Sequence, residues 1–418
     1  MSDKMKFIDL FAGCGGLSLG LEQAGFTPVF VNELNDHALS SYLANREEIG
    51  LVPGSDTCND IREISGSVSR LDKFAKKMSS EHGDIALIVG GPPCQGYSAR
   101  GIRSTFSTVQ KHEMPSNHLY KEMAKVIKAV GPKIFLFENV AGLTTARWNK
   151  KGKSGEIFRD VLYTFEKIRI KPSGLDYALH WQVVKAKDYG VPQNRPRLLL
   201  VGVRRDLKLR SDLSSTAGGY LPDPLNSKPP DPCDLLGDLI DLRARNGGET
   251  LKYKRIWKND TQKQLRKKKN GYGHSSKGEP LSEQKYTKHS ELVTERFAYM
   301  IKHPGKPPER LRIKKFSQKT LPRRWGKGGP SITATSAPDD YVHYELPRIF
   351  TVREWARLQM FPDWYQFCGP RTTGGRRRAG DPSLGIWDRE LPRYTQIGNA
   401  VPVKLAYEIG LHFKKILS

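Results

Sequence analysis

The chain has 418 residues, enough for more than one hydrophobic core, because single cores rarely grow beyond about 250–300 residues. It carries 69 Lys and Arg against 44 Asp and Glu, a formal net charge of +25 at pH 7. This charge attracts polyanions, so nucleic acid is the expected partner, although a basic surface kept for solubility would give the same composition. The length excludes a mini-protein, and 37% hydrophobic residues are enough for packed cores.

Cysteine usage and hydropathy exclude two further classes. The five cysteines are too few and too scattered for a disulfide framework and have no zinc-knuckle spacing, so we expect a reducing compartment and no metal. The apolar run near the N-terminus is too short for a signal peptide, and no stretch approaches about 18 apolar residues. A membrane-spanning segment is therefore not expected.

From Lys6 to about Arg204, short β-branched runs alternate with segments of helical spacing. This alternation predicts an α/β fold on a parallel sheet covered by helices on both faces, in which each strand leads into a crossover helix. The expected strands are residues 7–11, 29–32, 85–90, 134–138, 180–186 and 198–203. The expected helices are residues 17–24, 37–45, 119–130 and 157–168.

After Arg205 the alternation ends and prolines cluster, which indicates a domain boundary. Residues 251–270 hold nine Lys and Arg against one acidic residue, with Tyr253 and Trp257 between them. Such a stretch is either a solvated arm or a surface that follows phosphates. A second basic, glycine-rich segment begins at Arg371, and its role is left open.

The first expected strand leads into a turn of small residues, FAGCGG at positions 11–16, which we call the first turn. Such a turn lets a nucleotide-like cofactor approach backbone N–H groups, although it is equally typical of a purely structural tight turn. Ser18 stands where a dinucleotide fingerprint has glycine, which argues against a pyrophosphate cradle. Glu33, at the end of the next strand, favours a ribose contact, and Asp60 with Ile61 favours an adenine contact.

A cysteine follows the third expected strand in the segment GGPPCQGYS, residues 90–98. The prolines stiffen this segment and present Cys94, whereas most structural cysteines lie inside apolar runs. We interpret Cys94 as a nucleophile, since a thiolate is the reactive form and basic neighbours would favour it.

Charged residues also mark the ends of later strands. Glu138 ends the strand of residues 134–138 at the edge where open α/β sheets place their active sites, although capping or salt bridging would be its default role. Arg195 and Arg197 stand at alternate positions before the strand of residues 198–203. We expect them to point the same way and to hold a carboxylate and a ring oxygen.

The ordered set of motifs resembles the DNA (cytosine-5)-methyltransferases of bacterial restriction–modification systems. It consists of FIDLFAGCGGLSLG, GGPPCQGYS, FENV, YGVPQNRPRLLLVG, RIFTVREWARLQMFPD and QIGNAVP. The resemblance implies a Rossmann-like large domain that binds S-adenosylmethionine and a smaller target-recognition domain. The implied boundaries are 1–205 for the catalytic domain, 206–394 for the small domain, and 395–418 for a segment that returns to the catalytic domain. Within that segment, Gln396 to Leu411 would pack beside the first strand.

By the same resemblance, Cys94 adds to C6 of a flipped-out cytosine, and Glu138 hydrogen-bonds N3 and the exocyclic amine. Arg195 and Arg197 would orient the ring oxygen and Glu138. Asn59 replaces a glycine common in the family before the aspartate, which puts the local turn in question. The residues implied for the cofactor are Phe11, Gly13, Gly15, Glu33, Asp60, Ile61, Pro93, Leu119, Asn399 and Val401.

The implied substrate is a short specific sequence of duplex DNA. The expected DNA contacts are Gln95, Ser98, Arg100 and Arg103 after the nucleophile, with Lys254 and Arg255 in the basic stretch. The resemblance also implies a monomer in the bacterial cytoplasm, associated with the nucleoid, with or without a companion restriction endonuclease. The alternatives are a transfer-RNA cytosine-5 methyltransferase of similar architecture and a catalytically silent DNA-binding relative.

Overall fold

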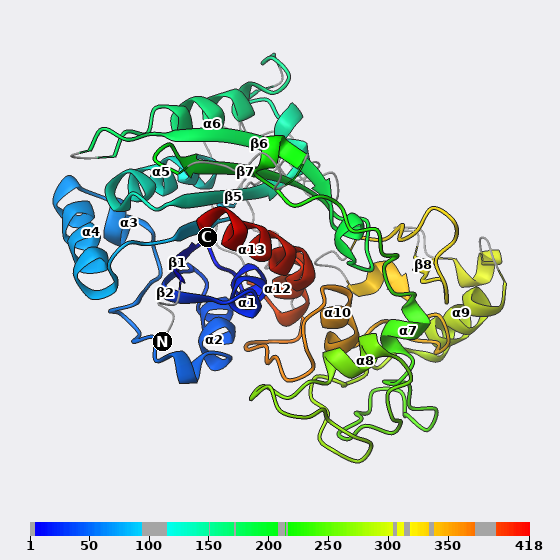
Figure 1. Ribbon diagram of the computed structural model, residues 1–418. Helices are drawn as coiled ribbons and strands as arrows, with labels where there is room; N and C mark the ends of the chain where they lie inside the picture. Colours follow the sequence, from blue (N-terminus) through cyan, green and yellow to red (C-terminus); the bar gives the residue numbers. More distant parts are fainter. Residues whose placement is uncertain are drawn as a thin grey trace.

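A computed structural model of the protein describes residues 5–93, 115–149, 151–170, 173–207, 214, 216–303, 307–312, 318–333, 338–372 and 390–418. Figure 1 shows a large part, a sheet with helices on both faces, beside a small part of short helices and irregular chain. We call residues 216–372 the small part. The expected α/β fold class is confirmed.

In the described part of the chain, seven strands form one sheet in the order β3-β2-β1-β4-β5-β7-β6. The expected strands are all present, with ends shifted by a few residues, and the two-residue strand β3 was not predicted. Their bounds are β1 Met5–Leu10, β2 Phe26–Asn32, β3 Thr57–Cys58, β4 Leu87–Gly90, β5 Ile134–Val140, β6 Tyr177–Lys185 and β7 Pro196–Arg204.

The prediction of an all-parallel sheet is wrong at β7. Strands β1 to β5 pair in parallel, but β7 lies between β5 and β6 and runs antiparallel to both. The reason is the short connection from β6 to β7. Residues 186–195 include only the 3-10 turn Ala186–Tyr189, whereas a parallel pairing needs a crossover of about a dozen residues or more, usually a helix. The expectation that each strand leads into a crossover helix therefore fails for β6.

Helices cover both faces of the sheet (Figure 1). On one face of the sheet, α4, α5 and α6 bury Phe74, Met123 and Val161, and on the other face α1 and α13 bury Leu17 and Ile409. The bounds in the large part are α1 Gly16–Gln23, α2 Asp36–Ala44, α3 Arg62–Ser65, α4 Val68–His82, α5 Leu119–Val130, α6 Glu156–Glu166, α12 Arg393–Asn399 and α13 Val403–Leu417.

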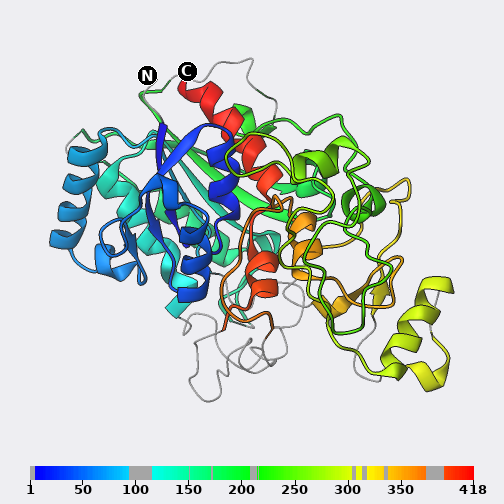
Figure 2. The ribbon, with the colours of Figure 1, turned by 90° about the horizontal axis from the view of Figure 1, so that it is seen from below.

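The end of the chain lies beside its beginning. Helix α13 lies beside α1 in both views (Figures 1 and 2), and its Ala406 packs so closely on Gly20 that a Cβ there would approach to 2.4 Å. Helix α13 also buries Leu405, Ile409 and Phe413 against the sheet. The last helix therefore completes the core that the first strand begins.

The small part has its own buried cluster around Leu235, Tyr253 and Trp355, and this cluster continues into Cys14 of the first turn. Its helices and strands are α7 Pro232–Leu236, α8 Asp260–Leu265, α9 Glu291–Lys302, α10 Val352–Leu358, β8 Lys319–Thr320 and β9 Tyr341–Val342. The remaining 3-10 turns are Glu47–Ile49, Pro115–His118, Ala141–Thr145, Thr216–Gly219, Glu309–Leu311 and Pro338–Asp340. The domain boundaries stay a prediction.

Across the described ranges, no helix combines the length and apolar character needed to cross a membrane.

His343 is fully buried in the small part, directly after β9. Its Nδ1 accepts hydrogen bonds from the backbone N–H groups of Glu345 and Leu346, at 3.0 and 3.1 Å. Burial lowers the pKa of His343 from 6.5 to about 3; the nearby Glu354 carboxylate opposes the shift and Arg348 adds to it. The fold therefore holds the imidazole neutral at pH values where the unfolded chain is protonated.

This pKa shift predicts a loss of stability in acid. Between pH 6.5 and about 3 the unfolded state binds a proton that the folded state does not, so His343 costs about 1.4 kcal/mol of unfolding free energy per pH unit of decrease. In urea unfolding at pH 7, 6 and 5, the free energy of unfolding should decline less steeply for His343→Asn than for the parent chain. All other titrating groups are the same in the two proteins. Equal slopes would contradict the assignment.

Candidate active site

The structure describes no residue between Pro93 and Pro115, so several predicted site residues lie outside the described residues. They are Cys94, Gln95, Ser98, Arg100 and Arg103. The segment 373–389, which includes most of the second basic stretch, is also outside. The site is therefore built from the residues that surround these segments.

Glu138 and Arg197 form an ion pair on neighbouring antiparallel strands. In the register of β5 and β7, Glu138 lies opposite Leu199, so Arg197 is its diagonal neighbour on the same face. Arg197 Nε lies 2.6 Å from Glu138 Oε1, and the two side chains are 9% and 12% exposed. Burial lowers the pKa of Arg197, and the Glu138 carboxylate opposes that shift. The pair thus holds a carboxylate in a fixed place at the end of the sheet.

Arg195 lies just before β7 and is also buried. Its Nη2 donates to the carbonyl oxygen of Gly398 in α12, at 2.6 Å. Burial and the neighbouring Arg197 lower the pKa of Arg195, while Glu138 opposes the shift. The structure therefore brings both predicted arginines near Glu138 and ties one of them to the C-terminal segment.

The start of the cysteine segment lies against the end of β5. A Cβ on Gly91 would stand 2.9 Å from Glu138 Oε2, so only glycine lets the carboxylate approach this closely. Asn139 Nδ2 donates to the carbonyl oxygen of Pro92 at 3.1 Å and holds the segment in place. Sequence reasoning missed the role of Asn139, although its position directly after Glu138 was a usable signal.

The first turn and Glu33 are brought together as expected. The Glu33 carboxylate accepts hydrogen bonds from the backbone N–H groups of Gly13 and Asn35, both at 2.8 Å. Burial raises the pKa of Glu33, and these two N–H groups oppose the rise. Phe11 and Gly13 have φ of 59° and 57°, and nothing lies within 4 Å of a Cβ built on Gly13. The turn therefore opens onto free space beside a carboxylate.

Asn32 connects the first turn with the predicted adenine contact. Its side-chain oxygen accepts from Phe11 N at 3.2 Å, and its Nδ2 donates to Asn59 O at 2.8 Å. Asn59 is not among the residues with positive φ, so this turn does not need the family's glycine. Asp60 accepts from Arg62 N at 2.9 Å and stays partly exposed, whereas Ile61 is 2% exposed and packs in the core.

Ser18 has a structural role that explains why glycine is absent there. Its hydroxyl donates to Asp9 Oδ2 at 2.5 Å and lies 2.8 Å from the Tyr42 hydroxyl, with all three side chains buried. Burial raises the pKa of Asp9 to about 7, and the Ser18 bond opposes the rise. The helix after the first turn is thus anchored to β1 by side chains rather than by close backbone packing.

The remaining cofactor candidates are Val401, Asn399, Pro93 and Leu119. The carbonyl oxygen of Val401 would lie 2.5 Å from a Cβ on Gly16, so it packs closely against this glycine. Asn399 is the last residue of α12, and its side chain is exposed. Pro93 is exposed at the end of the described segment, and Leu119 begins α5 and packs partly against the core. Their contacts with a cofactor stay a prediction.

The basic stretch is only partly available for contact. Lys254 is exposed and Arg255 donates to Gly237 O at 3.3 Å, but Tyr253 is 3% exposed, with its ring under Arg266 and its hydroxyl bonded to Asp363. The interpretation of Tyr253 as an aromatic contact among cations is therefore wrong. A tyrosine inside a charged stretch was needed for the core of the small part.

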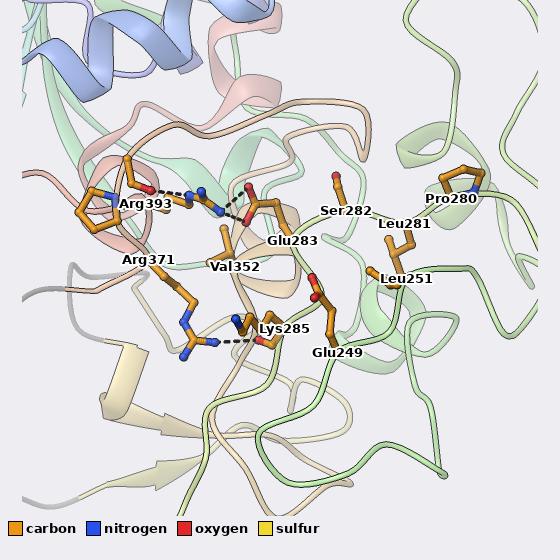
Figure 3. A pocket seen from close by; sticks show the side chains of 12 residues that line it. Glu249, Leu251, Pro280, Leu281, Ser282, Glu283, Lys285, Val352, Arg371 and Arg393 are labelled. Atoms are coloured by element: carbon orange, nitrogen blue, oxygen red, sulfur yellow. Dashed lines mark hydrogen bonds and ion pairs between the residues drawn. The ribbon is translucent and has the colours of Figure 1, made fainter.

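A cavity of about 660 Å³ lies between the small part and the start of α12 (Figure 3). Glu283 and Arg393 form an ion pair at its edge, and Arg371 donates to the carbonyl oxygen of Lys285. The cavity is lined by none of the predicted catalytic residues, so we do not assign the chemistry to it. Over the described ranges, no group of three or more His, Cys, Asp or Glu side chains could hold a metal ion.

Comparison with known proteins identifies the family. The sequence matches the C-5 cytosine-specific DNA methylases over residues 5–415. It is 30% identical to the type II methyltransferase M.DdeI of Desulfomicrobium norvegicum, covering 97% of this chain and 88% of that protein. It is also 30% identical to the type II methyltransferase M.XorII of Xanthomonas oryzae, covering 98% and 84%.

Solved structures agree in fold. A prophage-encoded protein of Escherichia coli superimposes with a TM-score of 0.65 at 25% identity over 99% of both chains. The Dnmt2 methyltransferase of S. pombe, at 15% identity and a TM-score of 0.52, covers 99% of this chain and all of its own and supports the fold alone. The chain therefore belongs to the C-5 cytosine-specific DNA methylase family, and it is a DNA cytosine-5 methyltransferase.

Proposed function

We propose that the protein methylates C5 of a cytosine flipped out of a specific short duplex DNA sequence, with S-adenosylmethionine as the methyl donor and a covalent bond between Cys94 and C6. The observation that carries this proposal is the buried Glu138–Arg197 pair, which abuts Gly91 at the start of the segment that leads to Cys94. Only Pro92 and Pro93 separate Gly91 from that cysteine. In the sequence, Cys94 therefore comes three residues after the glycine that lies against the Glu138 carboxylate.

The residues present fit the proposed cofactor. The open space beside Gly13 adjoins the buried Glu33 carboxylate, which can accept bonds from ribose hydroxyls. Asn32 links this turn to Asn59, the neighbour of the partly exposed Asp60. Backbone N–H groups of the first turn favour negative charge, such as the carboxylate of the donor. When bound, S-adenosylmethionine supplies an electrophilic methyl group on a sulfonium sulfur.

The chain's own groups make cytosine reactive. The Cys94 thiolate forms a bond to C6 while Glu138 shares a proton with N3. The electrons of the C5–C6 double bond move to C4–C5 and those of the C4–N3 double bond move to N3, so that C5 becomes the electron-rich carbon of an enamine. Arg197 keeps the Glu138 carboxylate in place, and Arg195 holds the ring oxygen. After methylation, water takes the C5 proton, the C5–C6 double bond forms again as the Sγ–C6 bond breaks, and N3 returns its proton to Glu138. The thiolate and the aromatic ring are thereby restored.

Base flipping is required because C6 of a stacked cytosine is out of reach of a protein side chain, and it costs roughly a few kcal/mol. Contacts with the phosphates offset this cost, and the net charge of +25 favours them. We propose that the small part carries target recognition, that Lys254 and Arg255 contact DNA, and that the loop residues Gln95, Ser98, Arg100 and Arg103 contact DNA beside the flipped base.

The biological setting is proposed on the same basis. The relatives M.DdeI and M.XorII are type II methyltransferases, which favours a monomeric enzyme of the bacterial cytoplasm that acts on the nucleoid, either with a companion restriction endonuclease or alone. Membership of the DNA methylase family favours DNA over transfer RNA as the substrate. The relatives' names as methyltransferases argue against the alternative of a catalytically silent DNA-binding protein.

DNA binding is expected to weaken steeply with salt, because phosphate contacts release counterions. With about 6–10 contacts, affinity should fall by about 10³–10⁵ between about 50 and about 200 mM salt. Fluorescence anisotropy with labelled duplex DNA measures this slope, which Lys254→Gln should reduce by about one unit. Lys414→Gln, an exposed lysine at the end of α13, is the matched control and should leave the slope unchanged. A salt-independent affinity would contradict the proposed DNA surface.

The proposed activity is tested by bisulfite sequencing of DNA from cells that express the protein, compared with cells that express Cys94→Ser. Protected cytosines at one short recurring sequence, absent with the variant, would support the function and report the recognised site. Methyl transfer to transfer RNA but not to duplex DNA in vitro would support the RNA alternative instead.

A further inference from the structure

Two side chains from distant segments donate hydrogen bonds to backbone carbonyl oxygens of the first turn. The Tyr365 hydroxyl donates to the carbonyl oxygen of Cys14, and Arg46 Nη2 donates to that of Gly15 at 3.2 Å. Arg46 Nη1 also donates to the Tyr365 hydroxyl at 3.1 Å, so the two side chains act on the turn together. Because Gly15 has a φ of 83°, its carbonyl direction depends on such external partners.

The first turn is closely packed at Gly15 and open at Gly13. A Cβ on Gly15 would lie 2.8 Å from Arg46, 2.8 Å from Tyr42 and 2.9 Å from Tyr365, so no water can stand between them. Beside Gly13, by contrast, nothing lies within 4 Å of such a Cβ. The turn is therefore fixed from within and open where the cofactor is proposed to bind.

Arg46 is itself fixed in position. Its Nε pairs with Glu22 of α1 at 2.7 Å, and its guanidinium stacks on the Tyr42 ring at 3.8 Å from the centroid. Only 2% of Arg46 is exposed. A buried, stacked and paired guanidinium has little freedom, so it can define the position of the groups that it bonds.

Tyr365 is anchored from the opposite direction, through the small part. The fully buried Arg353 of α10 donates to the carbonyl oxygen of Tyr365 at 2.8 Å and to that of Pro362 at 3.1 Å. The same guanidinium donates to the Ser282 hydroxyl at 3.0 Å. The residue that touches the first turn is thus held by residues on the proposed recognition side.

We propose that Tyr365 and Arg46 are positioning residues for cofactor binding: they hold the first turn in its binding geometry, and cofactor affinity depends on a segment anchored in the small part. This inference rests on the proposed cofactor. Loss of the Tyr365 hydroxyl leaves the Cys14 carbonyl without this donor and loosens the turn, so we expect about 5- to 20-fold weaker cofactor binding.

The test compares Tyr365→Phe with Tyr177→Phe in the full-length protein. Tyr177 is a matched control, because it is also buried and its hydroxyl also donates to a backbone carbonyl oxygen, that of Pro132 at 2.8 Å. It belongs to β6 and not to the first turn. Isothermal titration with S-adenosylhomocysteine measures affinity, and circular dichroism with a thermal melt checks folding. Tyr365→Phe should raise Kd and the KM for S-adenosylmethionine about 5- to 20-fold, with kcat at saturation and DNA affinity within about twofold.

Arg46→Lys, which keeps the charge beside Glu22 but lacks the forked guanidinium, should weaken cofactor binding in the same direction. Unchanged binding in Tyr365→Phe, or an equal loss in Tyr177→Phe, would overturn the inference and leave the proposed function intact. Failure of the parent protein to bind S-adenosylhomocysteine would instead overturn the proposed cofactor, and the inference with it.

Discussion

Replacing Cys94 with serine is expected to reduce methyl transfer roughly 10³-fold or more, because a hydroxyl is a far weaker nucleophile than a thiolate at neutral pH. Folding and DNA affinity should be retained, since the change removes only the sulfur. Transfer of tritiated methyl groups to duplex DNA measures the activity, and a thermal melt measures stability.

Cys233→Ser is the matched control for this prediction. Cys233 is partly buried in α7, and burial raises its pKa, so it is not a thiolate and should not contribute to the reaction. Activity of Cys233→Ser should stay close to that of the parent chain. Normal turnover by Cys94→Ser would refute the assignment of the nucleophile.

Glu138→Gln is expected to lower kcat by about 10²–10⁴-fold, because an amide can hydrogen-bond the ring but cannot share a proton with N3. It also leaves the Arg197 guanidinium, whose side chain is 9% exposed, without its anion. Breaking a buried pair costs up to about 3–5 kcal/mol, so chemical unfolding must be measured alongside kcat.

The control for Glu138 is Glu283→Gln. Glu283 is as buried, with its side chain 11% exposed, and pairs with Arg393 at 2.9 Å, but it lies in the small part, at the edge of the cavity. Glu283→Gln should lower stability and leave kcat within about threefold. If both variants lost activity in proportion to stability, Glu138 would have no special place in the chemistry.

The parts of the fold that the sequence predicts are those with a strong local signal. Strand β4 is an unbroken apolar run and β5 begins with one, residues 134–137, and α5 places Met123, Val126 and Ile127 on one buried face. Helix α4 was missed because only Phe74 and Met78 are buried in a segment otherwise rich in charge. The direction of β7 has no local signature at all, since it depends on the short connection from β6.

The same distinction applies to the site. Glu33 and Glu138 could be predicted because each stands at or near the carboxyl end of a parallel strand, and the topology brings these ends to one edge. Arg197 begins β7 and reaches the same edge only because β7 is antiparallel, so its motif, and not the expected parallel sheet, pointed to it. The contact between Arg46 and Tyr365 joins residues 319 positions apart and has no motif of its own. Tyr253 was misjudged because charged neighbours hid its burial, which only the packing of α8 and α10 reveals. Contacts between residues far apart in the sequence therefore could not be predicted from local sequence patterns.

The covalent step is tested most directly with duplex DNA that carries 5-fluorocytosine at the recognised position. Fluorine at C5 cannot leave as a proton does, so the enzyme–DNA adduct should persist after methyl transfer and survive denaturation. Mass spectrometry should then find the modified nucleotide on the peptide that contains Cys94, and no adduct with Cys94→Ser. An adduct on another residue, or methylation of normal DNA with no trapped complex on the fluorinated one, would contradict the account.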